Sequence, residues 1–408
     1  MGDSRFAGTP GAVLERLLRV IEETFPVPGR FRSALPGDVA ELSRLLTSAR
    51  PDREGGYLGR PNLLSAYLRY FLPWNVFRLS RLFALVCGEG GSARGAGTAK
   101  GAGSGSGSGS ANGAGVFLNL RGGDAVTDLG SGPLTLPVAL WLFRPELRKL
   151  NLEFRCVDHT GSVLEAGKKL FGALERAEGE TGSWKIRTIR ASLDLPVRGG
   201  KAALVTAINV FNEVYQRDSP ARASEKALGI LDRSGEGSIL VMEPGVPKSG
   251  AFIAALRNGL LERGKRIAAP CTHETPCPLP GGGRGAKWCH FAFDASEAPA
   301  KLHRLSAAAG IPKERAVFSF LLAGKEAPES RAGIRVVSDA FPVPGGWGRY
   351  GCGYREGGHE ENGLVLLWGS KAEMEGAPPG TLVEIPAGAR TDIDGKSGGI
   401  SVNVHGAR

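Results

Sequence analysis

The segment AVTDLGSGPLTLPVALWL, residues 125–142, contains the pattern that decides the fold. Residues 125–129 predict a short strand that leads into a glycine-rich turn. Gly130 and Gly132 let the backbone turn sharply and approach a ligand closely. Residues 134–142 then predict a helix with Pro137 in its first turn. In open α/β sheets, ligands bind at this kind of strand-to-helix turn.

The alternation of strand and helix continues toward the C-terminus. Short apolar runs predict four more strands, at 152–157, 184–189, 203–208 and 238–242. Apolar residues at helical spacing predict helices at 162–178, 221–232 and 250–263. This order indicates an α/β fold with a parallel, doubly wound sheet. Residues 316–323 and 334–337 are expected to add late edge strands.

Composition divides the chain into five expected parts. Residues 1–90 are predicted to form a helical N-terminal domain, and the Gly/Ser-rich residues 91–115 to form a linker. A Rossmann-like core follows at 116–270. Residues 271–352 form a cysteine-rich region with late strands, and residues 353–408 form a small β-rich appendage.

The chain is basic, with a formal net charge of +10 over 408 residues. A basic balance favours contact with nucleic acid, although a solvated, arginine-rich surface explains it equally well. Between residues 257 and 287, six Lys/Arg and two Glu give a local charge of +4 beside Trp288. No apolar run is long enough for a membrane span, and the N-terminus does not read as a signal peptide. We therefore expect a protein of the cytoplasm with no membrane partner.

Three carboxylates follow predicted strands at the edge where a ligand would bind. Asp128 lies just before the glycines, with Leu129 between it and Gly130, and is expected to bind the ammonium of a methionine moiety. Asp158 is expected to accept hydrogen bonds from ribose hydroxyls, and Asp194 from an adenine amino group. The alternatives are a tight turn, a helix N-cap and an Asp-Pro turn, respectively. A dinucleotide site is disfavoured because Thr135 stands where the third glycine is needed.

The order of four motifs resembles that of class I methyltransferases: DLGSGP (128–133), CVDHT (156–160), INVFNEVY (208–215) and LVMEPG (240–245). More narrowly, residues 120–355 resemble the methyltransferase-like family associated with the small ribosomal subunit, which includes mitochondrial ribosome assembly proteins. The sequence departs from the pattern at Leu134, where glycine is common. The resemblance implies a class I Rossmann-like fold, S-adenosylmethionine as cofactor and small-subunit ribosomal RNA as partner, with the mitochondrial matrix as the alternative location. The implied cofactor-binding residues are Asp128, Gly130, Gly132, Asp158, Asp194 and Asn209.

Four of the six cysteines lie in Gly- and Pro-rich surroundings. They are Cys271, Cys277 and Cys289 in APCTHETPCPLPGGGRGAKWCHF (269–291), and Cys352 in RYGCGY (349–354). Four thiolates are a ligand set for zinc or for a four-iron cluster, and spacing leaves both metals open. The family resemblance implies a [4Fe–4S] cluster. His273 and His290 are alternative ligands.

Catalytic residues are the least defined part of the sequence. After the fourth strand, amino-group methyltransferases often have an Asn/Asp-Pro-Pro-aromatic motif, and this chain has Asn209-Val210-Phe211-Asn212-Glu213 instead. Asn212 and Glu213 are the candidates for orienting a substrate. Ala-Pro-Cys at 269–271 resembles the nucleophile motif of RNA cytosine-5 methyltransferases, but it follows the wrong strand. Two functions remain open: a ribosomal RNA methyltransferase, and a non-catalytic assembly factor that keeps the cofactor pocket.

Overall fold

A computed structural model describes most of the chain, in two compact units. The described residues are 8–47, 57–87, 120–179, 183–193, 201–214, 217–282, 286–325, 333–354, 363–383, 391–393 and 400–403. The first unit holds residues 1–81, 120–267 and 279–326, and the second holds 82–119, 268–278 and 327–408. The expected linker at 91–115 lies outside the described residues.

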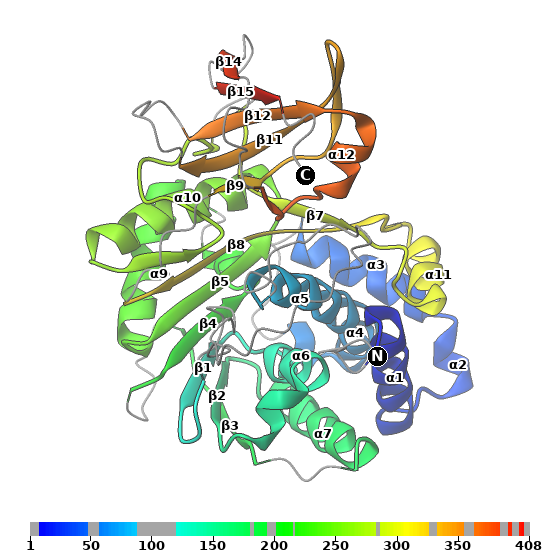
Figure 1. The fold of residues 1–408 in the computed structure, drawn as a ribbon. Helices are drawn as coiled ribbons and strands as arrows, with labels where there is room; N and C mark the ends of the chain where they lie inside the picture. The colour runs from blue at the N-terminus through cyan, green and yellow to red at the C-terminus, as the bar shows by residue number, and fades with distance from the viewer. Residues whose placement is uncertain are drawn as a thin grey trace, which may run out of the picture. The chain divides into compact units, whose positions relative to one another are not determined.

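The first unit contains a sheet with the order β3-β2-β1-β4-β5-β8-β6, with β7 paired to β8 (Figure 1). Its first five strands pair in parallel, and β8 runs antiparallel to β5. The strands are β1 Ala125–Leu129, β2 Glu153–Asp158, β3 Lys185–Arg190, β4 Leu204–Ile208, β5 Ser238–Pro244, β6 Arg266–Ala269, β7 Phe291–Asp294 and β8 Arg315–Gly324. The predicted Rossmann-like α/β fold is confirmed.

Crossover helices cover this sheet. They are α6 Thr135–Phe143, α7 Gly161–Ala177, α9 Pro220–Ser234 and α10 Pro247–Glu262, with the short 3-10 helix η5 at Pro145–Lys149. From β1 the chain moves to β2 and β3 in one direction, and from β4 to β5 in the other. Because such crossovers are right-handed, α6 and α7 lie on one face and α9 and α10 on the other. Figure 1 shows these two pairs on separate sides of the strands.

The strands and helices predicted between residues 125 and 263 all occur, with ends shifted by at most three residues. The late strand at 316–323 occurs as β8, but it lies between β5 and β6 and not at an edge. Three short elements are additional: β6, β7 and the helix α11 at Ala300–Ala308. β6 and β7 have only four residues each, too few to show a clear period.

Helices at the N-terminus complete the first unit. They are α1 Pro10–Thr24, α2 Gly29–Arg32, α3 Leu35–Leu46, η2 Tyr57–Gly59, α4 Pro61–Ala66 and α5 Leu72–Cys87. Thr9 caps α1 by accepting a hydrogen bond from the Ala12 amide at 3.4 Å. Between α4 and α5 the chain makes one π-helical turn, η3, at Tyr67–Phe71. Within the described residues, no helix is both long enough and apolar enough to cross a bilayer.

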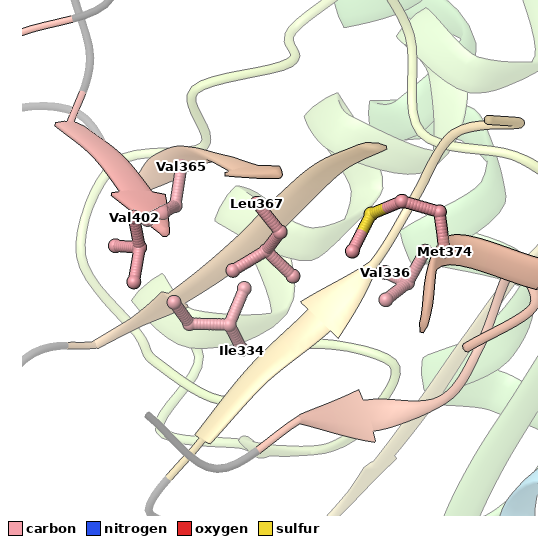
Figure 2. Packing of buried hydrophobic residues seen from close by; sticks show 6 residues of the cluster. All are labelled: Ile334, Val336, Val365, Leu367, Met374 and Val402. Atoms are coloured by element: carbon pink, nitrogen blue, oxygen red, sulfur yellow. The ribbon is translucent and has the colours of Figure 1, made fainter. Parts of the chain in front are cut away.

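The second unit has a sheet of its own, with the order β13-β9-β11-β12-β15-β14 and β10 paired to β11. Its elements are β9 Gly333–Val336, β10 Phe341–Val343, β11 Gly346–Tyr354, β12 Leu364–Gly369, α12 Lys371–Gly376, β13 Leu382–Val383, β14 Thr391–Ile393 and β15 Ile400–Asn403. Figure 2 shows the apolar cluster on which this sheet packs, formed by Ile334, Val336, Val365, Leu367, Met374 and Val402. The late strand predicted at 334–337 belongs to this sheet as β9.

Candidate cofactor site

A cavity of about 1080 Å³ lies at the carboxyl ends of the parallel strands of the first unit. Gly130 and Gly132 after β1, Asp158 at the end of β2 and Asn209 after β4 all line it. Residues 191–193, which follow β3, add to the wall. The structure thus brings four of the six predicted cofactor residues to one cavity, at the edge of the sheet where α/β proteins bind ligands.

The loop after β1 depends on backbone conformations that favour glycine. Gly130 and Gly132 have φ of +61° and +53°. A Cβ added at Gly130 would lie 2.5 Å from a methyl carbon of Val210, so this position also needs the close approach. Leu134 has φ of +59°, which explains why glycine is common there in the family pattern. The helix α7 accommodates the leucine at Gly167, where an added Cβ would lie 2.6 Å from Leu134 Cγ.

Asp158 joins the second strand to this loop. Its Oδ2 accepts from the Gly132 amide at 3.1 Å, and its Oδ1 accepts from the Thr160 amide at 2.9 Å. The side chain is 13% exposed, and it lies on the cavity wall. A carboxylate so held has fixed oxygens on the wall and accepts further hydrogen bonds through their remaining lone pairs.

Asp128 is placed differently, behind the loop and away from the cavity wall. It is 1% exposed, and its carboxylate accepts from Ser131 Oγ at 2.5 Å and from Thr206 Oγ1 at 2.7 Å. Burial raises the pKa of Asp128 to about 6, although both hydroxyls act against the rise. In this arrangement Asp128 links the loop after β1, through Ser131, to β4, through Thr206. Its contact with an ammonium stays a prediction.

The segment after β4 is held by a buried carboxylate that the sequence did not single out. Glu243 Oε1 accepts from the amides of Val210 and Phe211 at 3.1 and 2.7 Å. Its Oε2 accepts from the Asn212 amide at 3.2 Å. These bonds cap the short helix α8 (Phe211–Val214) and fix Asn209, whose φ is +58°.

The remaining predicted site residues are less defined. Asn212 lines the cavity and is 9% exposed, while Glu213 lies in α8 with its side chain outside the described part. Asp194 lies outside the described residues. The positions of these residues do not identify a general acid or a general base.

The N-terminal helices supply a wall of the cavity that the sequence analysis missed. Tyr67, Tyr70, Phe71, Asn75 and Arg78 line it from η3 and α5. Tyr67, Phe71, Asn75 and Arg78 follow one another at intervals of four, four and three residues, which puts them on one helical face. This pattern was visible in the sequence but indistinguishable from an ordinary core face. Asn75 Oδ1 accepts from Asn209 Nδ2 at 3.4 Å, so this wall contacts the predicted cofactor loop.

The four loop cysteines are each partly exposed, and none forms a disulfide within the described part of the chain. Cys289 belongs to the first unit, and Cys271, Cys277 and Cys352 belong to the second. Within the second unit, His273 Nε2 lies 3.2 Å from Cys352 Sγ, and His273 Nδ1 lies 2.6 Å from Thr275 Oγ1. Among described residues, no group of three or more His, Cys, Asp or Glu is arranged to hold a metal ion. Cys156 differs, because it is fully buried and burial raises its pKa strongly.

Comparison with known proteins gives a family match and several structural likenesses. The model of the family described as mitochondrial small ribosomal subunit Rsm22 matches residues 124–343, more than half of the chain. None of the curated proteins matches the sequence.

The structural likenesses are to methyltransferases, all at low identity. One is a class I S-adenosylmethionine-dependent methyltransferase, described as putative, from Listeria monocytogenes: 9% identity, 78% of this chain, 91% of that chain and a TM-score of 0.37. A second, from Geobacter sulfurreducens with bound S-adenosyl-L-homocysteine, has 14% identity, 50% and 85% coverage and a TM-score of 0.29. A third, from Clostridium acetobutylicum, has 17% identity, covers 30% of this chain and has a TM-score of 0.22; the chain spans 43% of its length.

Proposed function

The chain belongs to the mitochondrial small ribosomal subunit Rsm22 family, and from this premise we propose that it binds S-adenosylmethionine and acts on small-subunit ribosomal RNA. The observation that carries the proposal is the cavity at the strand ends, lined by Gly130, Gly132, Asp158 and Asn209. The family description also favours a mitochondrial location over the cytoplasmic one expected above.

The residues on the cavity wall fit the proposed cofactor. Gly132 forms the wall with its backbone alone, and a Cβ added there would be in van der Waals contact with hydroxyl oxygens of Tyr67 and Thr135 at 3.6 and 3.8 Å. Asp158 offers carboxylate oxygens for the ribose hydroxyls. Asn209 lines the same cavity directly after β4, which is separated from β2 by β1. When bound, S-adenosylmethionine supplies an electrophilic methyl group. The protein's part is to position the acceptor in line with it, which needs rigid walls more than acid–base groups.

Titration calorimetry with S-adenosylmethionine and S-adenosyl-L-homocysteine tests the cofactor site. Asp158→Ala should weaken both by on the order of 1.5–3 kcal/mol, because charge-assisted hydrogen bonds are lost. Asp294→Ala is the matched control, since Asp294 is an exposed aspartate bonded to Ser296. Unchanged affinity in Asp158→Ala would remove the cofactor from this cavity.

RNA as the acceptor is tested by methyl transfer. Transfer of labelled methyl groups from S-adenosylmethionine to small-subunit RNA supports an active enzyme. Cofactor and RNA binding without transfer would instead assign the non-catalytic role in assembly. The poor definition of the catalytic residues around Asn212 is the reason to keep this second function.

We propose further that Cys271, Cys277, Cys289 and Cys352 jointly bind one [4Fe–4S] cluster. The donor chemistry supports this, because all four are partly exposed cysteines outside any described disulfide, and cysteine thiolates bind such clusters. Anaerobic purification followed by iron, zinc and sulfide analysis is the test. Serine at any of the four positions should lose the metal, while Cys156→Ser should keep it. Stoichiometric zinc without sulfide would assign a zinc site instead.

A further inference from the structure

Two cations on the cavity wall have no acidic partner. Arg78 comes from α5 and Lys313 from the loop before β8, and both line the cavity. Neither forms an ion pair with a described carboxylate, whereas Lys226 on the same cavity pairs with Asp218. Among the described side chains that line the cavity, four are cationic (Arg78, Lys226, Arg233 and Lys313) and two are acidic (Asp158 and Glu225).

Lys313 is largely buried, which disfavours its charge, while two aromatic rings lie near enough to attract the ammonium. Its Nζ lies 5.9 Å from the ring centroid of Tyr70 and 6.0 Å from that of Trp74. Both rings are almost fully buried. Burial, together with the smaller effect of the positive charge of Arg78, lowers the pKa of Lys313 to about 8. The two cations are therefore close enough to repel each other, an arrangement that costs stability unless an anion joins them.

The side chain of Asn75 connects Arg78 to Asn209, in the segment after β4. Arg78 Nη1 donates to Asn75 Oδ1 at 2.8 Å, and the same oxygen accepts from Asn209 Nδ2 at 3.4 Å. Among the described atoms, the buried Nε of Arg78 has no hydrogen-bond acceptor. A guanidinium carries five N–H donors in a planar fork, so an oriented Arg78 still has donors for an oxyanion.

We propose that Arg78 and Lys313 form a phosphate subsite for the RNA nucleotide that enters this cavity. The inference deepens the proposed function and rests on it for the identity of the RNA. S-adenosylmethionine gains little from this pair, because its sulfonium and ammonium outweigh its carboxylate and leave it cationic. A phosphodiester carries the opposite charge. Tyr67 and Phe71, partly exposed on the same wall, offer aromatic faces on which an unpaired base stacks.

Fluorescence anisotropy with a labelled single-stranded RNA of about 12 nucleotides tests the subsite on the full chain. Lys313→Met and Arg78→Met should each weaken RNA binding by about tenfold or more. The slope of log affinity against log salt should fall by about one for each variant. Lys313→Arg should restore most of the affinity, because it keeps the charge. Lys201→Met is the control, since Lys201 is 82% exposed and pairs with Glu236.

Two further measurements separate a phosphate subsite from other roles. Titration with S-adenosyl-L-homocysteine should give the same affinity for wild type and Lys313→Met. The melting temperature of Lys313→Met should be equal to or above that of wild type, because a buried, unpaired charge has been removed.

Each contrary outcome overturns the inference. Weakened S-adenosyl-L-homocysteine binding with unchanged RNA binding would assign the cations to the cofactor's carboxylate. RNA affinity lost together with several degrees of melting temperature would assign Lys313 a structural role. Equal RNA affinity in all variants would leave the subsite without a ligand. If wild type binds RNA through Lys313 but binds no S-adenosyl-L-homocysteine, the subsite stands and the proposed cofactor function fails.

Discussion

Two aspartates at the ends of neighbouring strands carry different tasks. Asp158 has its carboxylate on the cavity wall, where it bonds backbone amides of the glycine loop and of the turn before α7. Asp128 has its carboxylate between the hydroxyls of Ser131 and Thr206, behind the loop. The sequence predicted both residues at the site from the strand-then-carboxylate pattern. It did not reveal which one faces the ligand, because that depends on which hydroxyls lie beside each carboxylate in the folded chain.

Replacement of Asp128 by Asn tests its buried role through pH. The folded-state pKa of about 6 lies above the unfolded value, so the stability due to the protonated carboxyl is present below about pH 4. That stability is lost as the pH rises through 6. Because Asn cannot ionise, the free energy of unfolding of Asp128→Asn relative to wild type should rise by about 2 kcal/mol between pH 4.5 and 7.5.

Urea unfolding at the two pH values measures this difference. Thr206 Oγ1 lies 3.5 Å from the Thr127 carbonyl, so it has an alternative acceptor when it must accept from the new amide. Asp124→Asn is the control, because Asp124 is a surface residue that accepts from the Arg121 amide. A pH-independent difference between Asp128→Asn and wild type would contradict the buried ionisation.

Glu243 is the residue that makes the segment after β4 rigid. Its carboxylate accepts from three consecutive amides and is fully buried. Glu243→Gln keeps the shape but presents an NH₂ group to at least one amide donor. We expect a loss of about 2–3 kcal/mol in the free energy of unfolding, and weaker cofactor binding through Asn209. Glu236→Gln is the control, since this carboxylate is 62% exposed and its replacement should leave stability almost unchanged.

At the scale of elements, the loop between β1 and α6 is shaped from both sides. Val210 packs on Gly130, and α7 approaches the loop at Gly167, where an added Cβ would meet Pro133 C at 2.6 Å and Leu134 N at 2.9 Å. Both contacts are with backbone or a buried branched side chain, which have little room to move. A glycine in a helix interior normally costs about 1 kcal/mol relative to alanine, so Gly167 is retained here for close packing.

Gly167→Ala should therefore weaken S-adenosyl-L-homocysteine binding, although residue 167 does not line the cavity. The added methyl displaces the Pro133–Leu134 backbone and with it the turn at Gly132. Gly172→Ala in the same helix is the matched control. Its Cβ would meet only the end of the Arg176 side chain at 3.5 Å, so stability should rise by up to about 1 kcal/mol with unchanged affinity. Equal affinities in the two variants would show that α7 does not shape the loop.

The elements that the sequence predicted well are the strands that are buried within one sheet. β1, β4 and β5 are buried along almost their whole length, and most of their residues are apolar. The cavity wall from η3 and α5 was not predicted as part of the site, because its aromatic and basic residues also fit a core helix. Arg78, Asn75 and Lys313 become a group only through tertiary contacts, and no local spacing indicates that.

For the molecule as a whole, the net charge of +10 predicts that RNA binding weakens steeply with salt. Each phosphate that a Lys or Arg neutralises releases counterions, so log affinity should fall linearly with log salt. The choice of variants follows from the structure. Lys265 Nζ donates to the carbonyls of Glu236 and Gly237, and Arg263 pairs with Asp232 and donates to the Gly259 carbonyl.

Charge reversal at Lys265 would therefore disturb the turn before β5 as well as any RNA contact. Lys287 belongs to the same basic segment, and its charge reversal is the variant to test. A melting curve must first show that Lys287→Glu keeps the wild-type stability. Anisotropy titrations between about 50 and 200 mM salt should then give a wild-type affinity that falls by a factor of about ten or more. Lys287→Glu should weaken binding to all RNA sequences alike, because phosphate contacts carry no sequence information. A flat salt response in wild type would exclude a phosphate-driven interface and leave the cavity with a small-molecule acceptor.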